Sequence, residues 1–248
     1  MTFRRKTRIM TNNHDLQNWG RLYTDERTVG HAGWSSEDSY KLKQSRISDA
    51  LVCHAISPPA TFLELGCGAG NVTLWMAGQG YNAYGIDLAP EGIDWAQDRA
   101  KGINCSAKFI VGDLADMSGF DSDYFDVVFD ADCIHMIIGS KRQDTFAEVY
   151  RTTKPGGLFI AGGNVGYANI QMKVKSGQEK RLFFDTDNQC FILNGDPKYN
   201  LKYIHRTEKE LAKEIEYAGF RIRCVQHHPK RGNASWIKDS IAIHAVKP

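Results

Sequence analysis

The sequence predicts an α/β fold, a three-layer sandwich in which helices cover both faces of a mostly parallel sheet. From residue 60 onward, short apolar segments alternate with segments of helical periodicity, and such alternation builds parallel β-α-β units. The segment Val127-Val128-Phe129 is continuously apolar, as expected of a strand buried on both faces. The chain has 248 residues, 42% of them hydrophobic, which suffices for one large domain with a substantial core.

The N-terminal region differs in character from the rest. Residues 1–36 are polar and interrupted by glycine, so we expect a basic tail followed by a partly ordered arm. A helix is expected to start after Ser36, because a serine hydroxyl caps a helix start and the acidic Glu37 and Asp38 suit the first turn. The pair Pro58-Pro59 ends this helical segment.

Strands and helices then alternate as far as residue 161. The helix that begins at Pro90 is favoured by that proline, which fits the first helical turn. The expected strands span residues 61–65, 82–86, 107–111, 125–129 and 158–161. The expected helices span residues 71–79, a segment from Pro90 onward, and residues 141–151.

The C-terminal part begins with a long connection and then resumes regular structure. Residues 164–206 form a connection longer than those usual in a compact domain, so we expect an inserted cap or lid there. The predicted organisation is a basic tail and arm over residues 1–36, and a single domain over residues 37–248 that carries this cap.

One helix and two strands are expected after the cap. The helix spans residues 207–218, and Thr207 with Glu210 forms a capping box at its start. The strands span residues 220–225 and 240–246.

Composition excludes several classes of protein. Charged residues make up 24% of the chain, a value typical of a globular rather than a disordered protein. The net charge is +2, yet the first ten residues contain four basic residues and no acidic one. The remainder is therefore close to neutral and lacks the broad basic surface that duplex nucleic acid requires. No segment approaches the roughly 20 apolar residues of a membrane span.

Cysteine usage and the N-terminus indicate the compartment. The six cysteines are scattered without a C-x-x-C pair, so we expect reduced thiols rather than a disulfide framework. The basic N-terminal segment is followed by polar residues, which is not the pattern of a secretory signal. We therefore expect a cytoplasmic protein. Its oligomeric state stays open, with a homodimer among the alternatives.

A glycine-rich turn carries the first functional signal. Gly66, Gly68 and Gly70 follow the first core strand and precede a helix. Glycines at such a turn let a ligand approach the backbone, and the helix start offers free N–H groups to an anion. A dinucleotide-binding loop would place glycine at position 71, where this chain has Asn71.

Two acidic residues follow at the ends of the next strands. Asp87 ends the second strand, where a carboxylate can accept hydrogen bonds from both hydroxyls of a ribose. Asp113 follows the third strand and suits the exocyclic amine of an adenine, because a carboxylate accepts what that amine donates. Rossmann-type dehydrogenases share the first acid but do not require the second.

In chain order, these residues resemble the class I S-adenosylmethionine-dependent methyltransferases. The segments Phe125–Ile137 and Lys154–Leu158 complete the resemblance, which covers residues 60–163 and extends loosely to the C-terminus. It implies a seven-stranded sheet whose last strand is antiparallel. It also implies S-adenosyl-L-methionine as cofactor and methyl transfer as the activity.

The resemblance assigns the cofactor-binding residues. Within this set, Asp87 holds the ribose, Asp113 meets the adenine amine and Asp130 lies near the reacting end. The full set consists of Glu64, Gly66, Cys67, Gly68, Gly70, Asp87, Leu88, Asp113, Leu114 and Asp130. Leu88 is expected against the adenine, and the acid and glycines of the first turn around the methionine and ribose portion.

The catalytic candidate is a histidine after the fourth strand. A hydroxyl or ammonium acceptor must lose a proton, and His135 lies at the sheet edge where ligands bind, with a pKa suited to this task. Packing within the turn is the alternative role of His135, and His205 is a second candidate base. Cys133 lacks the proline that precedes the nucleophile of cytosine-C5 RNA methyltransferases, so we do not expect a covalent role. Asp130 and Asp132 have no further acid at a helpful spacing, so no metal is predicted.

We expect the arm and the cap to recognise the acceptor, because loops above a rigid sheet carry specificity. The predicted substrate-binding residues are Tyr23, Trp34, His135, Asn164, Tyr167, Tyr199 and Tyr203. The predicted function is methyl transfer to an O, N or S atom of a small molecule. Two alternatives stay open: an RNA or protein methyltransferase that uses the basic tail and clusters, and a non-catalytic module that only binds S-adenosylmethionine.

Overall fold

The structure is a computed structural model of the chain. It describes residues 14–137, 139–165, 181–185, 190–194, 201–202, 207–229 and 239–248. Tyr167, Tyr199, Tyr203 and His205, all named above as candidates, lie outside the described residues.

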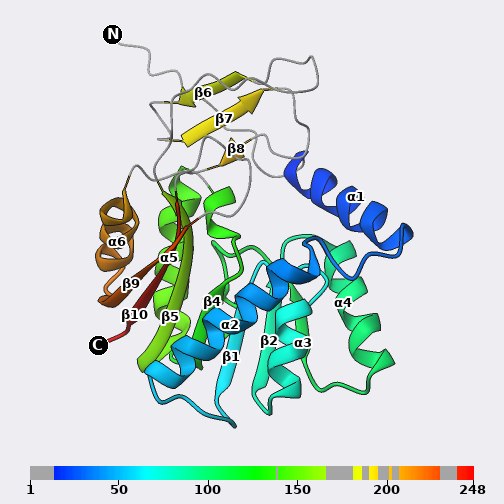
Figure 1. The fold of residues 1–248 in the computed structure, drawn as a ribbon, viewed down its shortest axis with the longest axis horizontal. Coiled ribbons are helices and arrows are strands. Elements are labelled where there is room, and N and C mark those ends of the chain that lie inside the picture. The colour runs from blue at the N-terminus through cyan, green and yellow to red at the C-terminus, as the bar shows by residue number, and fades with distance from the viewer. Residues whose placement is uncertain are drawn as a thin grey trace.

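A seven-stranded sheet forms the centre of the molecule (Figure 1). Its strands lie in the order β3-β2-β1-β4-β5-β10-β9. They are β1 (Thr61–Leu65), β2 (Asn82–Asp87), β3 (Lys108–Val111), β4 (Phe125–Asp130), β5 (Thr153–Val165), β9 (Arg221–Pro229) and β10 (Asp239–Val246). The first five are parallel to one another, whereas β10 pairs antiparallel with both β5 and β9. The predicted fold class, including the antiparallel last strand, is confirmed.

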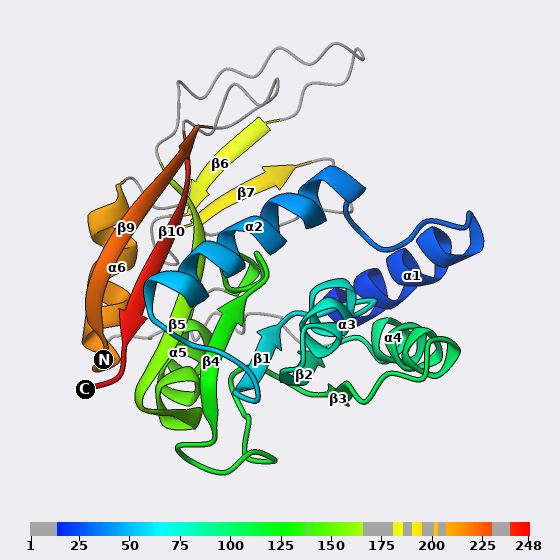
Figure 2. The same ribbon diagram turned by 60° about the horizontal axis from the view of Figure 1, so that its bottom comes forward.

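Helices cover both faces of this sheet, α2 and α3 on one side and α5 and α6 on the other (Figures 1 and 2). The helices are α1 (His14–Thr28), α2 (Glu37–Cys53), α3 (Asn71–Gly78), α4 (Pro90–Gly102), α5 (Ser140–Thr152) and α6 (Glu208–Tyr217). Alternation along β4 explains the two cores. Val127 packs among residues of α2 and α3, and Val128 among residues of α5 and α6. The strand is buried on both faces, as its apolar run predicts.

Two elements differ from the prediction. Helix α1 occupies most of the expected arm, and it packs against α4. Strand β5 spans Thr153–Val165 rather than residues 158–161, because β10 pairs with it from Leu158 to Val165. Long-range pairing of this kind leaves no local trace in the sequence.

Helix starts are capped unevenly. The Ser36 hydroxyl accepts a hydrogen bond from the Ser39 N–H and caps α2, as predicted. Thr207 stands at the start of α6 in extended conformation, but its side chain makes no capping hydrogen bond. The predicted capping box is therefore incomplete. The acidic residues Glu208 and Glu210 still place negative charge at the helix start, where the dipole favours it.

A second, smaller sheet lies within the connection predicted as a cap. Its strands β6 (Arg181–Asp185), β7 (Cys190–Asn194) and β8 (Leu201–Lys202) are antiparallel and lie in the order β6-β7-β8. This sheet lies beyond the carboxyl ends of β4 and β5 (Figure 1). Strand β8 contacts η1 (Ile134–Met136), a short 3-10 helix that follows β4.

Candidate functional site

The turn between β1 and α3 is tightly packed around its glycines. Gly66, Gly68 and Gly70 have φ angles of 69°, 48° and 74°, which disfavour residues with a side chain. A Cβ on Gly66 would collide with Cys133. A Cβ on Gly68 would lie 2.8 Å from the Tyr23 hydroxyl oxygen, and one on Gly70 2.6 Å from the Phe109 ring. The sequence therefore needs glycine at all three positions.

Asp87 ends β2 directly beside this turn, and it is almost completely buried. Its Oδ2 accepts hydrogen bonds from the Gly68 N–H at 2.9 Å and from the Tyr23 hydroxyl at 3.3 Å. Its Oδ1 accepts from the Ala89 N–H at 2.9 Å. Burial raises the pKa of Asp87 above its ordinary value, although these donors oppose the shift. The carboxylate is thus fixed in place, with a tyrosine hydroxyl as one of its donors.

Tyr23 reaches Asp87 from helix α1. Its ring is buried and packs with Ala69, Ala89 and Trp95. Burial, and then the charge of Asp87, raise the pKa of Tyr23 well above its ordinary value, so the hydroxyl keeps its proton and donates it. Tyr23 is a predicted acceptor-binding residue, but the structure places it on the glycine turn. This contact connects two segments 64 residues apart, so periodicity alone gives no signal for it.

Glu64 lies inside β1 and holds the start of α3. Its Oε2 accepts from the N–H of Thr73 at 2.8 Å and from the hydroxyl of Thr73 at 2.5 Å. Burial raises the pKa of Glu64 to about 7, against the opposing effect of these donors and of Lys43. Cys67, in the turn itself, is buried, and burial raises the pKa of its thiol. The thiol therefore stays protonated and serves as a small apolar side chain.

Asp113 is held on the far side of the turn by a lysine that sequence reasoning missed. Its Oδ2 lies 2.6 Å from the Nζ of Lys141 on α5, and its Oδ1 accepts from the Ala115 N–H at 3.0 Å. Partial burial opposes ionisation of Asp113, but Lys141 and the N–H outweigh it and lower the pKa. Leu114 is buried in the core, and Leu88 after β2 is half-buried.

Asp130 ends β4 and has one oxygen without a hydrogen bond. Its Oδ1 accepts from the N–H groups of Cys133 at 2.8 Å and Ile134 at 3.0 Å. Its Oδ2 is buried and has no hydrogen-bond partner. Burial and the nearby charge of Asp132 raise the pKa of Asp130 to about 6. A Cβ on Gly162 of β5 would lie 3.1 Å from Asp132 Oδ1 and 3.8 Å from Asp130 Oδ2, so a side chain at this position would be crowded against the two acids.

Asp132 follows β4 in a left-handed backbone conformation, with a φ of 65°. Lys43 of α2 lies beneath it, 3.2 Å from its Oδ2, and also donates to the Ala131 carbonyl at 2.9 Å. Burial opposes ionisation of Asp132, yet Lys43 and His135 outweigh it and lower its pKa. A non-glycine residue in this conformation costs on the order of 1 kcal/mol and is concentrated at functional sites. Lys43 was missed because helix docking, not local sequence, brings it to β4.

His135 lies in η1 and is half-buried. Its charge interacts with that of Asp132, which follows the buried Asp130 by two residues. Because β8 contacts η1, His135 lies between the end of β4 and the small sheet. Its role as a base stays a prediction that this location favours.

The remaining acceptor candidates are dispersed. Trp34 packs edge-on against Trp19 of α1, with ring centroids 5.8 Å apart, in the group of residues that also contains Tyr23. Asn164 lies on β5, opposite Ser240. Within the described part of the chain, no group of three histidine, cysteine or acidic residues is arranged to hold a metal ion. No helix among the same residues has the length and apolar character that crossing a bilayer requires.

Comparison with known proteins finds similarity to methyltransferases over part of the chain. The sequence pattern of a methyltransferase domain matches residues 63–161. An uncharacterized methyltransferase of Synechocystis sp. is 34% identical over 105 residues, which are 42% of this chain and 47% of that protein. Phosphoethanolamine N-methyltransferase 1 of Arabidopsis thaliana is 32% identical over 106 residues, which are 42% of this chain and 21% of that protein. The chain thus spans less than half the length of either relative.

A solved structure shares the fold over most of the chain. The 1,6-didemethyltoxoflavin-N1-methyltransferase of Burkholderia thailandensis, crystallised with 1,6-didemethyltoxoflavin and S-adenosylhomocysteine, superposes with a TM-score of 0.66. The superposition covers 94% of this chain and 87% of that one, at 22% sequence identity. At this identity, the likeness concerns the fold.

Proposed function

We propose that this chain transfers a methyl group from S-adenosylmethionine to an O, N or S atom of a small molecule. The match of residues 63–161 to a methyltransferase domain supports this proposal. The observation that carries the proposal is the buried Asp87 carboxylate beside the glycine turn, held by the Gly68 and Ala89 N–H groups. When bound, S-adenosylmethionine supplies an electrophilic methyl group on a sulfonium.

The residues of the turn fit this cofactor. Gly66 and Gly68 have positive φ angles that favour glycine, and glycine lets a ligand approach the backbone closely. Asp87 would accept hydrogen bonds from the ribose hydroxyls once the Tyr23 hydroxyl leaves its Oδ2. Asp113 would meet the adenine amine, with Leu88 and Leu114 as apolar neighbours.

At the other end, the residues after β4 would handle the acceptor. Methyl transfer is an in-line displacement in which a lone pair of the acceptor forms the new bond and the sulfur keeps the electrons of the old one. The protein must align the acceptor and exclude water. His135 would take the acceptor's proton, and the Asp132 carboxylate would stabilise the resulting imidazolium, because the two charges interact. Asp130 would lie near the reacting end of the cofactor.

Acceptor selection is assigned to the arm and the cap. The small sheet within residues 164–206 lies beyond β4 and β5 and contacts η1, which supports a role as a lid over the acceptor. A small molecule is favoured over nucleic acid because the chain beyond its basic tail is close to neutral. The Burkholderia neighbour was crystallised with bound 1,6-didemethyltoxoflavin, which agrees with this choice.

The proposal is tested with methyl-labelled S-adenosylmethionine and three acceptor pools: a low-molecular-weight extract, total RNA and denatured protein. We expect label in the small-molecule pool alone. Mass spectrometry should show that the labelled product is heavier than its acceptor by one methylene group, CH₂. Label in RNA or protein would support the corresponding alternative. Tight binding without transfer to any pool would support a non-catalytic module.

A further inference from the structure

Arg46 of α2 carries a charge that the described protein does not neutralise. Among the described residues, its guanidinium has no hydrogen-bond or ion-pair partner, and its Nε is fully buried. Burial lowers the pKa of Arg46, whereas the charge of Asp132 raises it. An arginine nevertheless stays ionised in proteins. A half-buried cation without a partner is costly, so this one is expected to have a ligand.

The position of Arg46 is fixed by its neighbour on the helix. Lys43 precedes it by three residues, so the two side chains share one face of α2. Lys43 contacts the Ala131 carbonyl and Asp132 at the end of β4. Arg46 therefore faces the carboxyl edge of the sheet, and the charge of Asp132 reaches it. Asp132 does not neutralise Arg46, because its Oδ2 is already paired with Lys43.

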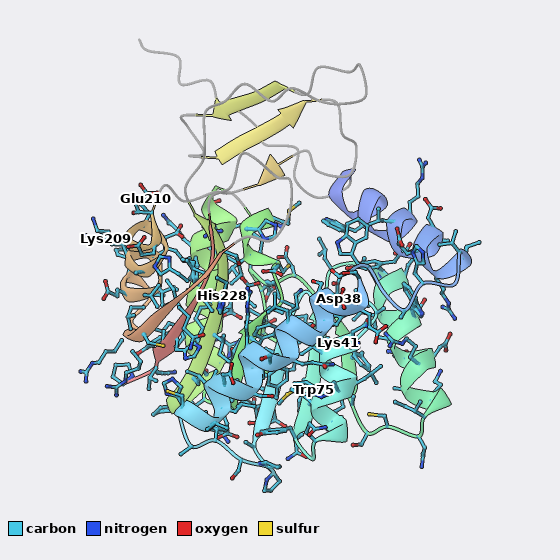
Figure 3. All side chains as sticks on the ribbon, in the orientation of Figure 1. Asp38, Lys41, Trp75, Lys209, Glu210 and His228 are labelled. Atoms are coloured by element: carbon cyan, nitrogen blue, oxygen red, sulfur yellow. The ribbon has the colours of Figure 1, made fainter. Side chains whose placement is uncertain are left out.

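A second polar atom without a partner comes from the opposite end of the chain. His228 lies near the end of β9, where it pairs across the sheet with Ser240 of β10 (Figure 3). Its Nε2 is buried and has no hydrogen-bond partner. Burial, and then the charges of Arg46 and His227, lower the pKa of His228, while Asp49 opposes them. At neutral pH the imidazole is therefore uncharged, and a tautomer with hydrogen on Nε2 has a proton to donate.

Among the described residues, the charged groups around Arg46 do not form an ion pair with its guanidinium. Lys43 and Asp132 compensate each other, and Asp49 is exposed. The site thus combines a planar fork of donors and one further N–H at the edge where ligands bind in such sheets.

We propose that Arg46 and His228 bind an oxyanion, a carboxylate or a phosphate, on the methyl acceptor. The existence of the site is inferred from the lack of partners at Arg46 and His228. The identification of its ligand as the methyl acceptor rests on the proposed function. The guanidinium pairs with two oxygens of the anion, and the His228 Nε2 donates to one of them. The acceptor is then held by its acidic end at α2 and β9, with its nucleophilic atom towards η1.

The test follows the Arg46 Nε–H signal by ¹⁵N NMR of the full chain. The signal is identified by its loss in Arg46→Gln. Inorganic phosphate and acetate are titrated separately at constant ionic strength, with chloride as the reference. We expect a saturable shift with at least one of the two anions, weakened at least tenfold in Arg46→Lys, which keeps the charge but loses the fork. His228→Gln weakens it several-fold. Saturation by phosphate alone assigns a phosphate ester, and by acetate alone a carboxylic acid.

Lys41→Gln is the matched control, because it removes one positive charge from the same helix at an exposed position, where Lys41 pairs with Glu37 (Figure 3). This variant should bind the anions as the wild type does. An Arg46 signal that moves no further than with chloride, or equal binding by Arg46→Gln in a phosphate titration by calorimetry, would overturn the proposal.

A parallel titration with S-adenosylhomocysteine separates this inference from the proposed function. Anion binding without S-adenosylhomocysteine binding would keep the site and remove the proposed function. The reverse result would keep the function and remove the site.

Discussion

At the scale of single residues, the acids at the strand ends share one design. Glu64, Asp87 and Asp130 are buried, and each accepts hydrogen bonds from backbone N–H groups. Burial raises the pKa of all three, while the N–H donors oppose it. The protein thus positions rigid oxygen atoms at the site and accepts a cost in stability for their charge.

Glu64 makes this cost measurable. Its pKa is raised from 4.5 to about 7, so its contribution to stability is complete below pH 4.5 and is lost as the pH rises through 7. Glu64→Gln keeps an oxygen that can accept from Thr73 but does not titrate. The free energy of unfolding of this variant should therefore increase relative to that of the wild type between pH 5 and pH 8, by about 3 kcal/mol at most. Urea denaturation at several pH values measures this difference.

An exposed control, Glu216→Gln, should show a flat difference across the same pH range. If the difference for Glu64→Gln were equally flat, the raised pKa of Glu64 would be wrong.

His135 provides the catalytic prediction. His135→Gln should lower the rate of methyl transfer about 100-fold, the usual size of a general-base contribution. Its dissociation constant for S-adenosylhomocysteine should stay within twofold of the wild type, because His135 is not among the residues assigned to the cofactor. Single-turnover kinetics and calorimetry measure the two quantities. A variant with normal turnover would leave His135 as a packing residue.

The sequence predicted which residues lie together where the geometry is local. The structure brings Gly68 and Asp87 into contact, because a strand end and the following turn fix their positions within a few residues, and their role in binding the cofactor stays a prediction. Lys43 and Lys141 were not identified, because their partners Asp132 and Asp113 are brought to them by helix packing. A local sequence pattern carries no information about that packing.

At the scale of elements, α1 is the main departure from expectation. The sequence predicted a partly ordered arm, since polar residues and glycines dominate residues 1–36. The helix instead buries its aromatic residues against α4 and the glycine turn. Those contacts are tertiary, and they place the Tyr23 hydroxyl on the carboxylate that the cofactor would use.

A conservative change tests this competition. Tyr23→Phe keeps the ring that packs on Ala69 and Trp95 but removes the hydroxyl from Asp87. Its affinity for S-adenosylhomocysteine should rise several-fold, because the ribose hydroxyls no longer displace a hydrogen bond of about 1 kcal/mol. Tyr217→Phe, at an exposed position on α6, should leave the affinity unchanged. A loss of affinity in Tyr23→Phe would mean that the hydroxyl contacts the cofactor instead.

At the scale of the whole molecule, the strand order explains where the site lies. The chain proceeds from β1 through β2 to β3 on one side and places β4 on the other side of β1. Ligands of open α/β sheets bind outside the carboxyl ends of the strands at such a reversal. The glycine turn follows β1, Asp87 ends β2 and Asp130 ends β4. The sequence predicted this architecture because each strand and turn has a local pattern, whereas the interior of the cap has none.

The central claim is that this edge of the sheet binds S-adenosylmethionine through Asp87. Calorimetric titration of the full chain with S-adenosylhomocysteine tests it, with Asp87→Asn as the comparison. We predict saturable binding at one site and, at 100 times the dissociation constant, about 2.7 kcal/mol of added stability, seen as a higher melting temperature. Asp87→Asn should bind at least tenfold more weakly while retaining the wild-type circular dichroism. Absence of heat together with an unchanged melting temperature in the wild type, or equal affinity in Asp87→Asn, would contradict the claim.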